Sequence, residues 1–131
     1  MNKSIRILVA NRPKLMRDLV VSILAEEPDM ELVGEVSEEE EIFARIQETA
    51  PDLVVIALED PKKRPALCEV ILRKNPEISV IAVAAQANRG VCYWAMVNIE
   101  SEDIELSEKG FLRAVRNMSE RVSAPYWRAT S

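Results

Sequence analysis

Reactive side chains are few in this sequence. The 131-residue chain contains no histidine, which removes the commonest general base and metal ligand in proteins. Ser-His and Cys-His nucleophile arrangements are therefore excluded. Cys68 and Cys92 form no Cys-x-x-Cys pair and lie in apolar helical patterns without an activating cation, so a redox role is not expected. Two lone thiols favour a reducing, cytoplasmic location.

Polar side chains with some chemical capacity follow the apolar runs of the chain. Asn11 and Arg12 precede a predicted helix, where a phosphate or carboxylate would bind, although a salt bridge or a capping role is the favoured interpretation. Glu59 and Asp60 follow the most apolar run, and we interpret them as solvated loop acids. The basic residues 62–64 have no interleaved aromatic side chains, so they do not predict nucleic-acid binding.

Strand-type runs and helical patterns alternate along the chain. Runs rich in β-branched residues with few charges are typical of strands covered on both faces. Pro13 suits the first turn of a helix, and Ser37 with Glu40 forms a capping box before another. The first four predicted strands are residues 5–10, 31–36, 53–58 and 79–84, with predicted helices between them.

The pattern is less regular after residue 84. Apolar spacing predicts a fourth helix, although Gly90 weakens its start, and residues 103–106 predict a short fifth strand. Ser107 is a clear N-cap for a last helix that ends near Val122, and residues 123–131 form a tail. The apolar residues of the predicted fourth helix are Val91, Cys92, Ala95, Met96 and Ile99.

Alternation of strands and helices predicts one α/β domain over residues 1–122, with a parallel sheet covered on both faces. Sites in such a sheet form at the carboxyl ends of the strands. The formal net charge of −5 argues against direct nucleic-acid binding, and no apolar stretch is long enough to span a membrane. The charged start of the chain does not fit a signal peptide.

Several segments together resemble the receiver domains of bacterial response regulators, over roughly residues 4–122. The resemblance implies a flavodoxin-like (CheY-like) three-layer sandwich, with a five-stranded parallel sheet of order 2-1-3-4-5. It rests on the order and spacing of the segments and not on one diagnostic motif. These segments are residues 5–17 (IRILVANRPKLMR), 26–36 (EEPDMELVGEV), 50–58 (APDLVVIAL) and 75–81 (NPEISVI).

The resemblance also implies a phosphorylation site, and this sequence departs from it at every matched position. The family uses two acids after the first strand and an aspartate at the end of the third to hold Mg²⁺ and accept a phosphoryl group. A hydroxyl after the fourth strand and a lysine after the fifth contact the phosphate. The corresponding residues in this chain are Asn11, Arg12, Ala57, Ala84 and the region of Ile104, where no lysine occurs.

We therefore expect a degenerate receiver domain, an atypical member of two-component phosphorelay signal transduction that acts through protein contacts without phosphorylation. We expect no enzymatic activity, no cofactor and no metal site. Tyr93 and Trp94 lie off the apolar stripe of the predicted fourth helix, which makes them candidates for an interface, although local packing is the favoured interpretation. The resemblance places them near the helix 4–strand 5–helix 5 face, through which a partner or a second copy would bind. Acids within residues 100–105 would either select a basic partner or simply keep the loop in water. The alternatives are the regulatory part of a transcription regulator, or a flavodoxin-like domain that binds a small ligand or nucleotide.

Overall fold

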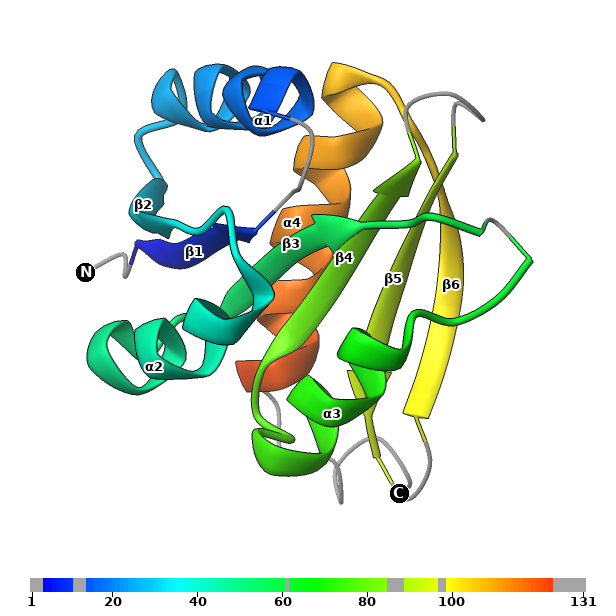
Figure 1. The fold of residues 1–131 in the computed structure, drawn as a ribbon. Coiled ribbons are helices and arrows are strands. Elements are labelled where there is room, and N and C mark those ends of the chain that lie inside the picture. The colour runs from blue at the N-terminus through cyan, green and yellow to red at the C-terminus, as the bar shows by residue number, and fades with distance from the viewer. Residues whose placement is uncertain (1–3, 11–13, 61, 85–88, 97–98, 124–131) are drawn as a thin grey trace.

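The computed structural model of the protein describes residues 4–10, 14–60, 62–84, 89–96 and 99–123, with side chains to residue 119. In these ranges, four helices pack on one sheet (Figure 1). No helix in the described ranges is long and apolar enough to cross a bilayer. The elements are, in order, β1 (Ile5–Ala10), α1 (Lys14–Ala25), β2 (Met30–Glu35), α2 (Glu39–Thr49), β3 (Leu53–Ala57), α3 (Ala66–Lys74), β4 (Ser79–Ala84), β5 (Arg89–Ala95), β6 (Ile99–Glu105) and α4 (Glu108–Ser123).

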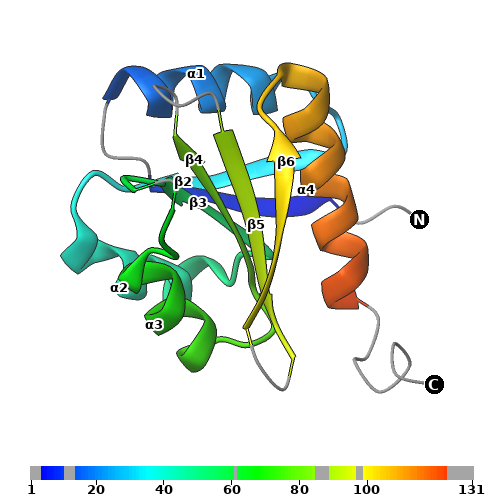
Figure 2. The same cartoon turned by 90° about the vertical axis from the view of Figure 1, so that its right-hand side faces the viewer.

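The molecule has three layers, with a mostly parallel sheet in the middle. The sheet has the order β2-β1-β3-β4-β5-β6, and its first four strands run parallel. Helices α2 and α3 cover one face, and α1 and α4 cover the other (Figures 1 and 2). β1, β3 and β4 are buried almost throughout, which explains their continuous apolar sequences. The predicted α/β class is confirmed, and the arrangement is consistent with a flavodoxin-like fold.

β5 stands where the sequence predicts a fourth helix, and that prediction is wrong. β5 runs antiparallel to β4 and continues through a hairpin into antiparallel β6. Val91 and Tyr93 pack on the α3 side of the sheet, whereas Cys92 packs on the α4 side. Because both faces of β5 are covered, its apolar residues do not alternate with polar ones, and their spacing also fits a helix. The predicted five-stranded, wholly parallel sheet is therefore corrected to six strands with an antiparallel hairpin at one edge.

β6 is the edge strand that includes most of the predicted fifth strand. It covers residues 99–105, begins earlier than predicted, and pairs with β5 instead of β4. Residues 100–103 are exposed, whereas Ile99 and Ile104 are half-buried on opposite faces of the sheet. An edge strand with an exposed middle tolerates this acidic sequence, which a central strand would not.

Gly90 allows β5 and β6 to approach closely. It lies opposite Ile104 in the antiparallel register. A Cβ atom at residue 90 would lie 2.8 Å from Cγ1 of Ile104, closer than carbon atoms pack without a shift. Gly90 is thus explained by strand packing, and its interpretation as a weak helix start is wrong.

The two predicted helix caps have different outcomes. At α4, the Gly110 amide donates a hydrogen bond to Oγ of Ser107 at 3.0 Å, which confirms the predicted N-cap. At α2, the N-cap residue is Glu38, and no side chain caps the helix, so the capping box predicted at Ser37 is wrong. Three glutamates in the first turn of α2 supply favourable charge at its positive end instead.

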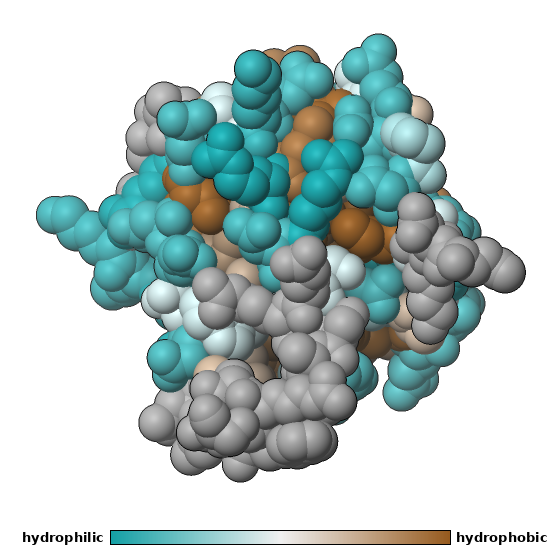
Figure 3. Space-filling model, turned by 180° about the vertical axis from the view of Figure 1, so that it is seen from behind, coloured by the Kyte–Doolittle hydropathy of each residue, from teal (hydrophilic) through white to brown (hydrophobic). Residues whose placement is uncertain are grey.

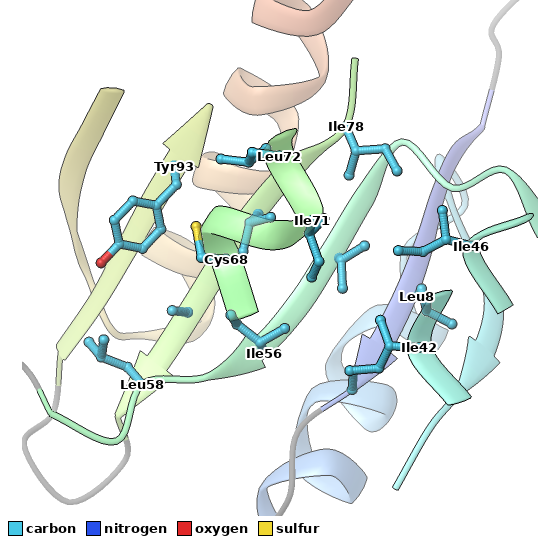
Figure 4. Close-up of a cluster of buried hydrophobic side chains, with 14 of the residues drawn as sticks. Leu8, Ile42, Ile46, Ile56, Leu58, Cys68, Ile71, Leu72, Ile78 and Tyr93 are labelled. Atoms are coloured by element: carbon cyan, nitrogen blue, oxygen red, sulfur yellow. The ribbon is translucent and has the colours of Figure 1, made fainter. Parts of the chain in front are cut away.

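Two apolar clusters hold the layers together, one on each face of the sheet. The first lies under α2 and α3 and is drawn in Figure 4, where Leu8, Ile42 and Ile71 converge from β1, α2 and α3. The second lies under α1 and α4 and includes Val20 and Val115. Most members of both clusters are less than 5% exposed, as expected for a packed interior.

Arg116 connects α4 to the loop before β2 through hydrogen bonds. Its Nε and Nη2 donate hydrogen bonds to the Asp29 carboxylate at 2.8 and 3.0 Å, and Nη2 also donates to Glu27 at 2.7 Å. The hydrogen bond from Arg116 is the main cause that lowers the pKa of Asp29 below its ordinary value. This bidentate contact joins segments that are far apart in the sequence.

Candidate functional site

The candidate site lies at the carboxyl edge of the parallel strands, and three neighbouring strands end there in alanine. β1 ends at Ala10, β3 at Ala57 and β4 at Ala84. In the sheet register, Ala10 lies opposite Ile56 and Ala57 lies opposite Val83, so the three strand ends are close together. Methyl groups therefore occupy the edge where a parallel α/β sheet carries its reactive side chains.

A cavity of about 400 Å³ opens beside two of these alanines. Ala10 and Ala57 line this cavity, together with residues from the start of α2 and from the loop that leads into α3. Ala84 does not line it. The other lining residues are Ser37, Glu38, Glu39, Ile42, Glu59, Asp60, Lys63, Arg64, Pro65, Ala66 and Leu67.

The charged side chains around this cavity are engaged in loop structure or exposed to solvent. The Lys62 amide donates to the Asp60 carboxylate at 2.9 Å, and the Lys63 amide donates to the Asp60 carbonyl at 3.1 Å. Asp60 thus closes a turn, and Glu59 is exposed beside it. Arg64 forms an ion pair with Glu69 of α3 at 3.5 Å. Both loop acids line the cavity, and neither stands at the strand end itself.

The structure brings together only some of the positions that the sequence predicts as a degenerate phosphorylation site. Ala57 and Ala84 end adjacent strands at the same edge. Asn11 and Arg12 lie outside the described residues. Ile104 lies opposite Gly90, near the carboxyl end of β6, but β5 separates β6 from β4, so Ile104 is one strand farther from Ala57 than predicted. The prediction that a fifth strand beside β4 would carry Ile104 to the site is wrong.

Arg89 is the cation beside the candidate site that the sequence interpretation misses. It is the first residue of β5 and lies directly opposite Ala84 in the register. Its guanidinium pairs with Asp103 of β6 at 3.1 Å and remains about 40% exposed. An antiparallel strand brings its beginning, and not its end, to the carboxyl edge of β4. When the residues after Arg89 are interpreted as a helix, the sequence gives no signal that Arg89 reaches this edge.

Tyr93 and Trp94 differ in exposure from each other. Tyr93 is 5% exposed and packs in the cluster under α3, so local packing is confirmed for Tyr93 and its alternative, exposure at an interface, is wrong (Figure 4). Burial raises its pKa above the ordinary value for tyrosine. Trp94 is half-buried against the α4 side of the sheet. An interface role for this pair stays a prediction, and Trp94 is the member that a partner can reach.

Cysteine and metal chemistry find little support in the described residues. Burial raises the pKa of Cys68 to about 12, so its thiol is not a nucleophile at neutral pH. Among the residues that the structure describes, no three His, Cys, Asp or Glu side chains come together in a group that would hold a metal ion.

Comparison with known proteins gives partial matches. The chain is 33% identical over 86 residues to a protein-glutamate methylesterase/protein-glutamine glutaminase of Agrobacterium fabrum. It is 29% identical over 89 residues to the protein of the same name from Pyrococcus abyssi. These stretches cover 65% and 67% of this chain but 24% of each relative. No family model matches the chain.

The matches and the fold together support a receiver-like domain, of the kind found in response regulators. The chain spans about a quarter of the length of these curated relatives. The esterase and glutaminase activities in their names belong to those proteins.

Proposed function

We propose that this chain is a receiver-like domain of two-component signal transduction that works without phosphorylation, has no catalytic activity of its own, and acts by binding other proteins in the cytoplasm. The observation that carries the proposal is Ala57 at the carboxyl end of β3. A methyl group has no oxygen with which to accept a phosphoryl group or to bind a metal ion.

The surroundings of Ala57 support the proposal. The neighbouring strands end in Ala10 and Ala84, so they supply no carboxylate or hydroxyl group from the strand ends themselves. The nearby carboxylate of Asp60 accepts a hydrogen bond from the amide of Lys62 within its own loop. Such an edge fixes one arrangement of the loops instead of switching between two, and regulation then comes from the binding of a partner.

The surface formed by β5, β6 and α4 is the proposed site of that partner. It occupies the place of the predicted helix 4–strand 5–helix 5 face, with a hairpin in place of helix 4. Trp94 gives it a half-buried aromatic side chain, and Glu100, Glu102 and Asp103 make the edge strand acidic. A basic partner complements this charge, whereas two copies that meet through β6 would bring like charges together.

Incubation with acetyl phosphate and Mg²⁺, followed by intact mass measurement, tests the absence of phosphorylation. We expect no acid-labile adduct on the wild-type chain. The Glu59→Gln and Asp60→Asn variants are run in parallel, because these two acids stand nearest to Ala57 in the chain. A stable adduct on the wild type would contradict the proposal, and its loss in one variant would identify the substitute acceptor.

Affinity purification from the native host tests the binding surface. Basic proteins recovered with the wild-type chain should be depleted with Trp94→Ala and with Glu100→Gln. Glu48→Gln is the matched control, because it removes one exposed acid from α2, away from this surface. Recovery of the same proteins with all four chains would exclude the β5–β6–α4 surface as the binding site.

A further inference from the structure

Helix α1 carries the most exposed large apolar side chains of the described residues. Leu15 is 83% exposed and Leu19 is 54% exposed, and they lie four residues apart on one face of the helix. Only Val20 and Leu24 of this helix are buried. A leucine ridge in water is unfavourable, and a partner that covers it gains the free energy of burial.

A hollow of about 460 Å³ runs beside this ridge, between α1 and the start of α4. Figures 1 and 2 both show the start of α4 next to α1, and Figure 3 shows hydrophobic surface between hydrophilic side chains on the α4 side of the sheet. Its apolar lining includes Ile23 from α1, Val83 from β4 and Phe111 from α4. Each molecule thus presents both a ridge and a hollow that would receive one.

Charge and side-chain size along the ridge indicate what covers it. The ridge continues through Ser22 to Glu26, at helical spacings of three and four residues. Ser22 is small and allows another helix to approach closely. Lys14 stands at one end of α1, 77% exposed, and Glu26 is exposed just beyond the other end. The positive and negative ends make the surface complementary to itself when two helices run antiparallel.

We infer that the α1 surface, defined by Lys14, Leu15, Leu19, Ser22 and Glu26, binds a second copy of this chain. A twofold axis near the middle of α1 sets Leu19 of each copy against Ser22 of the other. It also directs the Leu15 side chains toward the opposite hollows and pairs Lys14 with the Glu26 of the other copy, twice in each dimer. Within its own helix, Lys14 forms an exposed ion pair with Asp18, with Nζ and Oδ2 3.0 Å apart. Exposed ion pairs contribute little to stability, so replacing this pair with one to Glu26 of the other copy costs little free energy. This dimer goes beyond the proposed function and does not use the β5–β6–α4 surface.

Sedimentation equilibrium of the chain over a wide range of protein concentrations tests the inference. We expect a monomer–dimer equilibrium whose dissociation constant rises at least about 100-fold in the Leu15→Gln, Leu19→Gln double variant, because each leucine is buried twice in the dimer. Val70→Gln is the control, since Val70 is an apolar residue of α3 that is 40% exposed, and it should leave association unchanged. Far-UV circular dichroism verifies that each variant is folded.

Charge exchange tests the antiparallel geometry. Lys14→Glu and Glu26→Lys should each weaken association by about tenfold, and the double exchange should restore it to near the wild-type level. A wild-type chain that stays monomeric at all concentrations would overturn the inference. So would a dimer that is insensitive to the leucine substitutions, or one that is weakened only by Trp94→Ala.

Discussion

The two parts of the sheet differ in strand direction and in burial. From β1 to β4 the strands are parallel, alternate with helices and are covered on both faces, whereas β5 and β6 form an antiparallel hairpin that ends in an exposed acidic edge. The four segments that carry the resemblance to receiver domains all lie in the first part. The second part replaces a helix with a strand and changes which residues reach the carboxyl edge, as Arg89 shows.

The largest effect is expected in the parallel part, at Leu8. This residue of β1 is fully buried beneath α2, so Leu8→Ala should lower the free energy of unfolding by about 2–5 kcal/mol. Leu32→Ala in the neighbouring strand β2 is the matched control, because Leu32 is 37% exposed and should cost about 1 kcal/mol or less. Urea unfolding measures both. Equal losses would contradict the difference in burial between Leu8 and Leu32.

Gly90→Ala distinguishes the hairpin from the predicted helix by the sign of its effect. In the hairpin, the new methyl group meets Ile104, and we expect a loss of about 1–3 kcal/mol in the free energy of unfolding. In a helix, the same substitution would stabilise the protein by about 1 kcal/mol. The free energy of unfolding from urea denaturation gives the sign. In a double-mutant cycle, Ile104→Val should recover part of the loss, and additive effects would contradict this packing.

A smaller, pH-dependent effect is expected where α4 meets the parallel part of the sheet. Arg116→Gln should cost about 1 kcal/mol or less at pH 7, because the ion pair with Asp29 is partly exposed. Since Arg116 lowers the pKa of Asp29, this stabilisation is complete above about pH 4, the ordinary pKa of aspartate, and is lost as the pH falls through the lowered value. Urea unfolding from pH 7 to pH 2 should show the two proteins converging in acid. A constant difference would exclude titration of Asp29 as the cause.

The smallest effect on stability is expected at the acidic edge. Glu100 is exposed on β6, so Glu100→Gln should change the free energy of unfolding by less than about 0.5 kcal/mol. Thermal unfolding should give nearly the same midpoint for both chains. A marked change would mean that Glu100 supports the hairpin itself, and the loss of a binding partner in this variant would then have a structural cause.

The fold was predictable where apolar patterns had one physical interpretation. Residues 79–84 are short, β-branched and bounded by turn signals, and they form β4 as predicted. Residues 91–95 are also apolar, but a strand buried on both faces and a buried helix produce the same spacing over so few residues. The choice is decided by pairing with Val80–Ala84 on one side and β6 on the other, which are tertiary contacts that local sequence does not encode.

The candidate site was predictable only in part, for a related reason. Ala57 and Ala84 lie at the ends of strands whose register follows from the parallel sheet, so their positions were found from the sequence. Arg89 was missed because its place at this edge depends on the direction of β5, and Ile104 was predicted too close to β4 because β5 lies between β4 and β6. Reversal of one strand exchanges the residues at its two ends.

The two buried cysteines can report the opening of the two apolar layers separately, because one lies in each layer. Cys68 belongs to α3 and is buried between that helix and the sheet, whereas Cys92 belongs to β5 and is buried under α4. A thiol reagent therefore reaches Cys68 when α3 separates from the sheet, and Cys92 when α4 does. Labelling rates at the two sulfurs, followed separately by mass spectrometry, would report which layer opens first without any engineered probe.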